Sequence, residues 1–346
     1  MNLRHIYNTG YFLTFWEGPR RVTGFPQVLN KWAPYPSFLE VEVTTRCNLK
    51  CSICEHTYWD EPGKDMSLEE FKFIVDQFPN LKWIGLTGIG ESFLNPNFME
   101  MLWYVRNKDI LVELYDTMYF VDDRWAKALV GMGLTRLFIS LDAATGETYQ
   151  KIRVGSDWKR VTSNIATLLD IKGSAKSKYP HIGFHFIVTK DNMHEMPQYI
   201  EWVWSLQPPG QRRAHIQFSR MLHPYKQVRD LFTEVPEEII KNTKERARRL
   251  GVRVVWGLDV PPKKPPIKEC IEWTMPFIFV NGTVVPCCAG NEANARELQR
   301  TTALGNIFER PFKTLWKEEY KELRTLLRAG KLPAACKNCS IYEVPS

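Results

Sequence analysis

The sequence has no long uninterrupted apolar run, and this excludes a membrane-spanning helix of ordinary length. Its N-terminus, MNLRHIYNTGYFLTFWEGPRR, has only a short apolar stretch that Glu17 interrupts, and it lacks the small-residue cleavage site of a secretion signal. Internal repeats and low-complexity tracts are also lacking. Hydrophobic, charged, Gly and Pro contents are ordinary. We therefore expect a globular, cytoplasmic protein.

The net charge of +7 is not concentrated in one basic segment. Lysines and arginines are mixed with carboxylates in stretches such as KNTKERARRL and WKEEYKELRTLLRAGK, a pattern typical of solvated helix faces. A nucleic-acid partner is therefore disfavoured, because such a partner calls for a clustered basic surface. The 346 residues are enough for one large α/β domain and a smaller appendage.

Between about residues 37 and 258, short β-branched and aromatic runs alternate with segments of helical period. The pattern predicts strands at 38–45, 83–87, 111–117, 136–143, 182–189 and 215–220. It predicts helices at 67–78, 97–107, 124–132, 158–171, 196–206 and 237–250. This alternation indicates βαβ units and a parallel sheet, closed or nearly closed. Ligands of such sheets bind at the carboxyl ends of the strands.

Three segments are expected along the chain: an N-terminal extension at 1–36, a core domain at 37–258 and a C-terminal domain at 259–346. The stiff sequence PPKKPPIK is typical of a linker at the second boundary. Beyond it, MPFIFVNGTVVPC predicts a β-hairpin with a type I′ turn at Asn281-Gly282. A long amphipathic helix is expected at 312–330, before the last cysteine pair.

The eight cysteines form two groups, and close spacing in a reducing compartment favours metal or redox chemistry over disulfides. The first group, Cys47, Cys51 and Cys54, has CxxxCxxC spacing directly after a predicted strand. A [4Fe–4S] cluster normally takes four thiolates, so three would leave one iron open to another ligand. The alternative is a zinc site with His56 as the fourth ligand.

The run RCNLKCSICEH resembles the motif of the radical S-adenosylmethionine (SAM) superfamily, CxxxCxΦC, in which Ile53 stands at the apolar Φ position. The resemblance implies a partial (β/α)6 barrel and a [4Fe–4S] cluster whose open iron chelates the methionyl end of SAM. In that family, one electron from the cluster cleaves SAM to give a 5′-deoxyadenosyl radical. The segment LTGIGES, after the second predicted strand, is similar to the family's Gly-Gly-Glu segment.

That similarity implies that Gly88, Gly90 and Glu91 bind the SAM ammonium, although Ile89 and Ser92 depart from the usual pattern. After the fourth predicted strand, FISLDA and ETYQKIRVG resemble a further shared segment. Candidate cofactor-binding residues there are Ser140, Asp142 and Arg153. The resemblance places Ser140 at the SAM ribose or carboxylate and Arg153 at the methionyl carboxylate, which a planar guanidinium suits. Alternatively, Ser140 and Asp142 are ordinary polar residues of a loop at the end of a strand.

Another departure follows the third predicted strand, where relatives usually read Thr-Asn-Gly and this chain reads YDTMYF. Tyr115, Asp116 and Tyr119 are therefore either parts of a reshaped substrate wall or packing residues.

The second cysteine group resembles the SPASM/twitch extension of many radical SAM enzymes. Its members are Cys270, Cys287, Cys336 and Cys339, with Gly282 between the first two. Four such cysteines imply a single auxiliary [4Fe–4S] cluster, and a structural Zn(Cys)₄ site is the alternative. Cys288 is left over. It is the candidate catalytic residue, as a hydrogen-atom donor, or else a small packing residue beside the cluster.

The expected function is hydrogen abstraction from an unactivated C–H of a small molecule, followed by oxidation with help from the auxiliary cluster. This is the role implied by resemblance to the twitch-bearing dehydrogenase of aminocyclitol biosynthesis. An electron donor such as flavodoxin or ferredoxin is implied as a partner. The alternative is a peptide maturase or epimerase that uses Cys288, although 1–36 is too short for a leader-peptide recognition domain. A non-catalytic metal-binding scaffold is a third hypothesis.

Overall fold

A computed structural model of the chain describes residues 31–59, 61–207, 214–220, 226–258, 270–288, 302–337 and 339. Most of the expected N-terminal extension and the proline-rich linker lie outside these described residues. The chain divides into two compact units. The first comprises the described residues of 1–46, 63–112 and 261–346, and the second those of 47–62 and 113–260. No helix within the described ranges is long and apolar enough to span a membrane.

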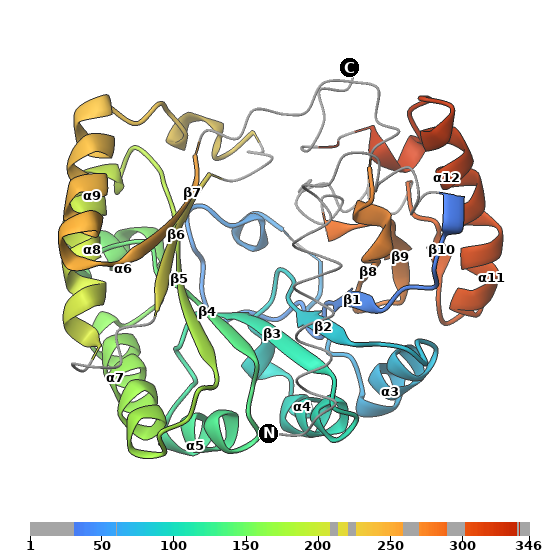
Figure 1. Cartoon of the computed structure of the whole chain (residues 1–346), viewed down its shortest axis with the longest axis horizontal. Helices are drawn as coiled ribbons and strands as arrows, with labels where there is room; N and C mark the ends of the chain where they lie inside the picture. Colours follow the sequence, from blue (N-terminus) through green and yellow to red (C-terminus); the bar gives the residue numbers. More distant parts are fainter. Residues whose placement is uncertain are drawn as a thin grey trace. The chain divides into compact units, whose positions relative to one another are not determined.

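The second unit is a parallel sheet with strand order β3-β4-β5-β6-β7. The strands are β3 (Leu111–Asp116, which starts in the first unit), β4 (Arg136–Ser140), β5 (His181–Ile187), β6 (His215–Ser219) and β7 (Arg253–Gly257). The helices are α5 (Asp123–Gly131), α6 (Gly146–Ile152), α7 (Trp158–Ser174), α8 (Met196–Leu206) and α9 (Glu237–Leu250). Helices α7, α8 and α9 lie along one face of these strands (Figure 1).

Side chains alternate between the two faces of this sheet, as the pleat requires. On the helix-covered face, the Phe186 ring centroid lies 4.8 Å from that of Tyr199 in α8 and 5.4 Å from that of Phe218. All three rings are fully buried. The other face carries more polar side chains, including His185 and Ser219, whose Nε2 and Oγ atoms are 2.6 Å apart. The face away from the helices therefore carries the polar side chains that can take part in binding or catalysis.

Strand β7 was not among the expected strands. It follows α9 and pairs in parallel with β6, from His215↔Arg253 to Ser219↔Gly257. Its residues are half-buried or exposed, so its sequence lacks the continuous apolar run that marks a central parallel strand. The first six expected strands are all present.

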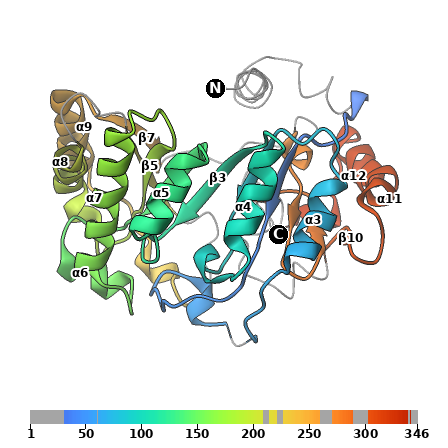
Figure 2. The same cartoon turned by 90° about the horizontal axis from the view of Figure 1, so that it is seen from below.

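In the first unit, β1 lies between β2 and β8 and pairs with both in parallel, in the order β10-β9-β8-β1-β2. The strands are β1 (Phe38–Val41), β2 (Trp83–Leu86), β8 (Phe277–Ile278), β9 (Thr283–Val285) and β10 (Gly305–Asn306). The helices are α3 (Leu68–Asp76), α4 (Phe98–Asn107), α11 (Phe312–Lys317) and α12 (Glu319–Arg328). Helices α3 and α4 lie side by side (Figure 2).

The expected hairpin is present, since β8 and β9 are antiparallel, but its turn differs from the expected type I′. Gly282 has a φ of +84°, whereas Asn281 is not among the residues with positive φ. The Gly282 N–H donates to the Phe279 carbonyl at 2.8 Å, and the Phe279 N–H donates to the Thr283 carbonyl at 2.9 Å. The connection is therefore a three-residue loop ending in a left-handed glycine.

The long helix expected at 312–330 is divided in two at Glu318, whose φ and ψ are −107° and −80°. Arg310 contacts the carboxylates on both sides of the break, with Nη2 2.5 Å from Glu318 Oε2 and Nη1 2.8 Å from Glu319 Oε1. Helical periodicity continues across the break, so the sequence pattern does not show it.

Candidate functional site

The first cysteine group lies in the second unit, in the loop that precedes the short 3-10 helix η3 (Glu55–Thr57). The three thiols gather around one apolar cluster. Its members are Leu49, Cys51, Ile53 and Ile152, with Cys47 and Cys54 packed against them. The Cys54 N–H donates to the Cys51 carbonyl at 3.0 Å, and the Thr57 hydroxyl donates to the same carbonyl at 2.6 Å. Ile53 is therefore part of the apolar cluster against which Cys47 and Cys54 pack.

Burial makes these thiols costly to ionise in the absence of a cation. It raises the pKa of Cys54 to about 12, and nearby negative charge on Cys51 and Cys47 adds to that rise. Burial also raises the pKa of Cys51, and the positive charge of Arg153 opposes the effect. An ionised Cys54 is thus opposed by negative charge on Cys51 and Cys47, and iron cations bound to the sulfurs would compensate that charge. The donor set fits a three-thiolate [4Fe–4S] site.

Among the side chains that the structure describes, no three Cys, His, Asp or Glu groups stand close enough together to hold a single metal ion. His56, the fourth ligand of the zinc alternative, lies in η3 with its ring edge-on to Trp59 at 6.3 Å between centroids.

The Gly88–Glu91 loop lies in the first unit, after β2. The Glu91 N–H donates to the Arg46 carbonyl at 2.8 Å. A Cβ atom on Gly90 would lie 2.4 Å from the Thr44 carbonyl oxygen and 2.8 Å from that of Arg46. Glycine is therefore required at this position, because backbone atoms cannot move aside cheaply. The loop is thereby attached to the residues that lead directly into Cys47.

The Glu91 side chain is buried, with 3% of its surface exposed, and it caps the 3-10 helix η4 (Ser92–Leu94) by accepting from the Phe93 N–H at 3.5 Å. A second buried carboxylate, Glu42, was missed by sequence reasoning. Its Oε2 accepts from the Ile89 N–H at 3.3 Å and its Oε1 from the Val280 N–H at 3.4 Å. The signal in the sequence is a carboxylate directly after β1, in the run FLEVEV, where Glu40 and Glu42 alternate with apolar residues.

Asp142 and Arg153 form a buried ion pair in the second unit. Arg153 donates from Nε at 2.7 Å and from Nη2 at 2.5 Å, both to Asp142 Oδ2. Asp142 Oδ1 accepts from the Ile187 N–H at 2.7 Å. Although burial works against the charged guanidinium, Asp142 raises the pKa of Arg153 above its ordinary value. The remaining side of the guanidinium, Nη1, lies 4.0 Å from Cys51 Sγ. Two residues that the sequence singled out are therefore brought to the cysteine loop.

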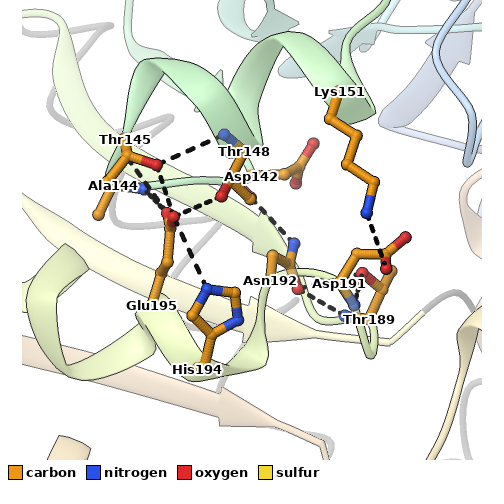
Figure 3. A network of polar contacts seen from close by, with 10 residues as sticks. All are labelled: Asp142, Ala144, Thr145, Thr148, Lys151, Thr189, Asp191, Asn192, His194 and Glu195. Atoms are coloured by element: carbon orange, nitrogen blue, oxygen red, sulfur yellow. Dashed lines mark hydrogen bonds and ion pairs between the residues drawn. The ribbon is translucent and has the colours of Figure 1, made fainter.

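A further buried carboxylate of this unit is Glu195, which sequence reasoning missed and which contacts the segment around Thr145 (Figure 3). It accepts from the Ala144 N–H at 2.6 Å and the Thr145 N–H at 3.1 Å. It also accepts from the hydroxyls of Thr145 at 2.6 Å and Thr148 at 2.5 Å. All four donors belong to the start of α6. The only sequence signal was an acidic residue just before Pro197, at the beginning of α8.

Asn192 completes the network by donating from Nδ2 to the carbonyl oxygens of Asp142 and Ile187, both at 2.9 Å (Figure 3). Its Oδ1 accepts from the Thr189 N–H at 2.7 Å. The loop after β5 therefore holds the segment after β4 through both Asn192 and Glu195. These contacts join residues about fifty positions apart in the sequence.

The inner face of the sheet carries the other candidates. Ser140 ends β4 and pairs in register with His185 of β5. Burial lowers the pKa of His185 to about 4, so its imidazole is neutral at physiological pH. Tyr115, from the unusual YDTMYF segment, stacks on Phe138 with centroids 4.7 Å apart. Asp116 shapes its own loop, since its Oδ1 accepts from the Met118 N–H at 2.5 Å.

The second cysteine group lies in the first unit. Burial is the main reason why the pKa of Cys270 lies well above its usual range. The negative charge of Glu272 raises this pKa further, and the charges of Cys336 and Cys339 add smaller contributions. Burial likewise raises the pKa of Cys336 to about 12, with Cys339 contributing. Within the second group, the charges of Cys336 and Cys339 therefore influence Cys270, and the charge of Cys339 influences Cys336. All eight cysteines are free of disulfides.

Cys287 and Cys288 follow the hairpin that β8 and β9 form. Cys287 lies near Tyr320, whose pKa is raised mainly by burial and further by the Cys287 charge. Cys288 packs against the apolar cluster of Phe277, Phe279 and Val285.

Comparisons with known proteins identify the class. The family described as the radical SAM superfamily matches residues 41–203, and the SPASM iron–sulfur cluster-binding domain matches residues 270–340. The structure of Streptococcus suis SuiB bound to S-adenosylmethionine is similar with a TM-score of 0.65 and 12% identity, over 86% of this chain and 70% of that one. Native anSMEcpe with bound AdoMet is similar with a TM-score of 0.56 and 18% identity, over 87% and 86%. The fold is the mixed α/β fold with a parallel sheet that these proteins share.

Two relatives in sequence span nearly the whole chain. The tungsten-containing aldehyde ferredoxin oxidoreductase cofactor-modifying protein of Pyrococcus furiosus is 24% identical over 88% of each chain. The AdoMet-dependent heme synthase of Methanosarcina barkeri is 22% identical over 89% of this chain and 90% of its own. The chain belongs to the radical SAM superfamily and carries a SPASM iron–sulfur domain. It is thus a radical SAM enzyme. Its cofactors are SAM, a [4Fe–4S] cluster and the auxiliary iron–sulfur centre of the SPASM domain.

Proposed function

We propose that this enzyme is a radical SAM oxidoreductase that removes hydrogen from an unactivated C–H of a small molecule and oxidises it. When bound, SAM and its cluster would supply a radical that takes one hydrogen atom. The auxiliary [4Fe–4S] cluster would then take up the second electron as the substrate releases a proton to water. The observation that carries the proposal is the gathering of Cys47, Cys51 and Cys54 around one apolar cluster, with Arg153 beside Cys51. This is a three-thiolate site with a fixed cation at its edge.

The chain's own residues have separate parts in this proposal. Cys47, Cys51 and Cys54 would hold the cluster of the core domain, and Ile53 belongs to the apolar side chains among which these cysteines lie. Gly88, Gly90 and Glu91 present carbonyl oxygens and a buried carboxylate to the SAM ammonium, because these groups accept hydrogen bonds from an amine. Ser140 and the Asp142–Arg153 pair form the side toward the ribose and the methionyl carboxylate. Arg153 contributes through Nη1, since Asp142 occupies its Nε and Nη2 atoms.

The auxiliary cluster is assigned to Cys270, Cys287, Cys336 and Cys339. The charges of Cys336 and Cys339 raise the pKa of Cys270, and the charge of Cys339 raises the pKa of Cys336. These effects support the grouping of the three thiols, and the segment after the β8–β9 hairpin supplies Cys287. Donor chemistry alone would also suit Zn(Cys)₄, and the match of residues 270–340 to the SPASM iron–sulfur domain favours iron–sulfur. We further propose residues 259–346 as the auxiliary domain and 37–258 as the core domain.

The substrate class is proposed from the relatives that this chain matches nearly end to end. Their names describe a cofactor-modifying protein and a heme synthase, which act on small molecules or prosthetic groups. The solved structures that hold peptides, such as SuiB bound to its precursor peptide SuiA, are similar to this chain in fold at 11% identity. A peptide maturase or epimerase is therefore the second candidate. A reducing cytoplasm and an electron donor such as flavodoxin or ferredoxin complete the proposal, because such clusters need reduction.

Iron content tests the proposal directly. Anaerobically reconstituted protein should bind about eight irons, the sum of two [4Fe–4S] clusters. Replacement of Cys47, Cys51 and Cys54 together by alanine should leave about four irons and abolish the reductive cleavage of SAM to 5′-deoxyadenosine. The matched control is Cys288→Ala, which should keep all eight. Stoichiometric zinc at the second group would refute the auxiliary cluster and leave the radical SAM assignment intact.

A further inference from the structure

Arg153 is fixed between a carboxylate and a thiol. Its guanidinium donates from Nε and Nη2 to Asp142 Oδ2 at 2.7 and 2.5 Å, and its Nη1 lies 4.0 Å from Cys51 Sγ. The side chain is largely buried, with 9% of the residue exposed, and Asp142 is fully buried. The cation therefore has its carboxylate partner on one side and a cysteine sulfur on the other, in a region of reduced solvent screening.

The backbone holds Arg153 opposite Cys51. The Lys50 N–H donates to the Val154 carbonyl at 2.8 Å, and the Ser52 N–H donates to the Ile152 carbonyl, also at 2.8 Å. The two hydrogen bonds lie on either side of Cys51 in one chain segment and on either side of Arg153 in the other. The arrangement resembles a short antiparallel pair, in which opposed residues keep a fixed separation. The distance between cation and sulfur is thus set by the main chain.

The network behind Arg153 prevents the cation from swinging away. The Arg153 N–H donates to the Tyr149 carbonyl at 2.7 Å as α6 ends, and Glu195 holds the start of the same helix through four hydrogen bonds. Asn192 and the Ile187 N–H hold Asp142 from its other side. A side chain held in this way keeps its positive charge at a fixed position beside Cys51.

We infer that Arg153 sets the reduction potential of the cluster that Cys51 ligates, making that cluster easier to reduce, while Asp142 moderates the effect. The inference rests on the proposed function in one respect, namely that Cys51 is a cluster ligand. A reduced cluster carries one more negative charge than an oxidised one, so a fixed cation near a ligating sulfur stabilises the reduced form more. Net charge and hydrogen bonds to the sulfurs are among the factors that set such potentials. Asp142, on the far side of the guanidinium, acts in the opposite sense.

An anaerobic redox titration of the full-length, reconstituted protein, followed by electron paramagnetic resonance, tests this inference. The signal of the cluster in question is recognised because it changes when SAM is added. Arg153→Gln should shift its midpoint to a more negative value, by on the order of a tenfold change in the reduction constant, or about 59 mV for one electron. Asp142→Asn should shift the midpoint in the positive direction. Arg153→Lys keeps the charge and should restore most of the wild-type value.

The midpoint potential should shift in opposite directions in Arg153→Gln and Asp142→Asn. This difference is decisive, because a general loosening of the site would shift the midpoint in the same direction in both variants. Same-sign shifts, or an Arg153→Gln midpoint equal to wild type, would overturn the inference. Arg310→Gln is the matched control, since this exposed arginine pairs with Glu318 and Glu319 at the α11–α12 break, and it should leave the midpoint unchanged. If Arg153→Gln fails to retain the cluster, Asp142→Asn decides the sign alone, and an unchanged or more negative midpoint in that variant would overturn the inference.

Failure of the proposed function is distinguishable from failure of this inference. Cys51→Ala should lose about four of eight irons, and retention of all eight would show that Cys51 is not a ligand. Loss of iron in Cys51→Ala together with an unmoved midpoint in Arg153→Gln would leave the proposed function standing and remove only the role assigned to Arg153.

Discussion

The backbone N–H of Glu91 donates a 2.8 Å hydrogen bond to the carbonyl oxygen of Arg46, the residue directly before Cys47. One main-chain contact thus attaches the loop after β2 to the start of the cysteine loop. Gly90 makes the contact possible, because a side chain there would collide with the Thr44 and Arg46 carbonyls.

Gly90→Ala should therefore disturb both stability and cofactor binding. The added Cβ would lie 2.4 Å from a backbone oxygen, and overpacking of this kind costs about 1–3 kcal/mol. We expect a lower midpoint of urea unfolding and weaker SAM binding by calorimetry. Gly131→Ala is the control, since nothing lies within 4 Å of its Cβ position at the end of α5. That variant should be neutral or up to about 1 kcal/mol more stable. Equal behaviour of the two variants would contradict the steric argument.

Glu91→Ala and Arg153→Ala should each weaken SAM binding without loss of either cluster. Each removes one proposed charge-assisted contact, on the order of 1.5–3 kcal/mol, or roughly tenfold to hundredfold in affinity. Calorimetric titration with SAM, alongside iron analysis, measures both quantities. Asp123→Asn, in an exposed ion pair with Lys127, is a suitable control. Unchanged affinity in both test variants would show that the methionyl pocket is misplaced.

Glu195→Gln should destabilise the protein. The amide replaces one accepting oxygen by a donor that faces the donors of Ala144, Thr145 and Thr148, so buried hydrogen bonds are lost. We expect a loss of about 2–4 kcal/mol in the free energy of unfolding, measured by anaerobic urea titration. Glu201→Gln makes the same substitution on α8, where Glu201 pairs with half-buried Arg246 and exposed Arg249. Its cost should stay under about 1 kcal/mol. Similar losses in the two variants would argue against a special role for Glu195.

Cys288→Ser distinguishes oxidation from epimerisation. Cys288 packs against Phe277, Phe279 and Val285, which favours a packing role. For a dehydrogenase, the variant should keep about eight irons and much of its activity, and product formed in D₂O should carry no solvent deuterium at carbon. For an epimerase, the wild type would incorporate one deuterium. The variant would then consume SAM without forming epimer, because an O–H bond is too strong to donate hydrogen readily. The second result would overturn the oxidoreductase proposal.

Several features of the site followed from local sequence alone. The spacing of Cys47, Cys51 and Cys54 after a strand, and the glycines before Glu91, are short-range patterns that determine chemistry within one loop. The parallel βαβ order followed as well, because each strand and helix has its own periodicity. By contrast, β7 and the helix break at Glu318 were not predicted. The residues of β7 are half-exposed, and the helical pattern continues across Glu318, so neither feature has a local signal in the sequence.

The sequence by itself determined the family, the two sets of thiols and the residues that resemble a SAM site. Only the tertiary structure decided what those side chains touch. It directed Nε and Nη2 of Arg153 to Asp142 and Nη1 to Cys51, and it placed Glu195 beneath α6. Such contacts join residues that are eleven to about a hundred positions apart. Their pairing depends on how the strands stack side by side, and no local pattern of apolar and polar residues encodes that distance.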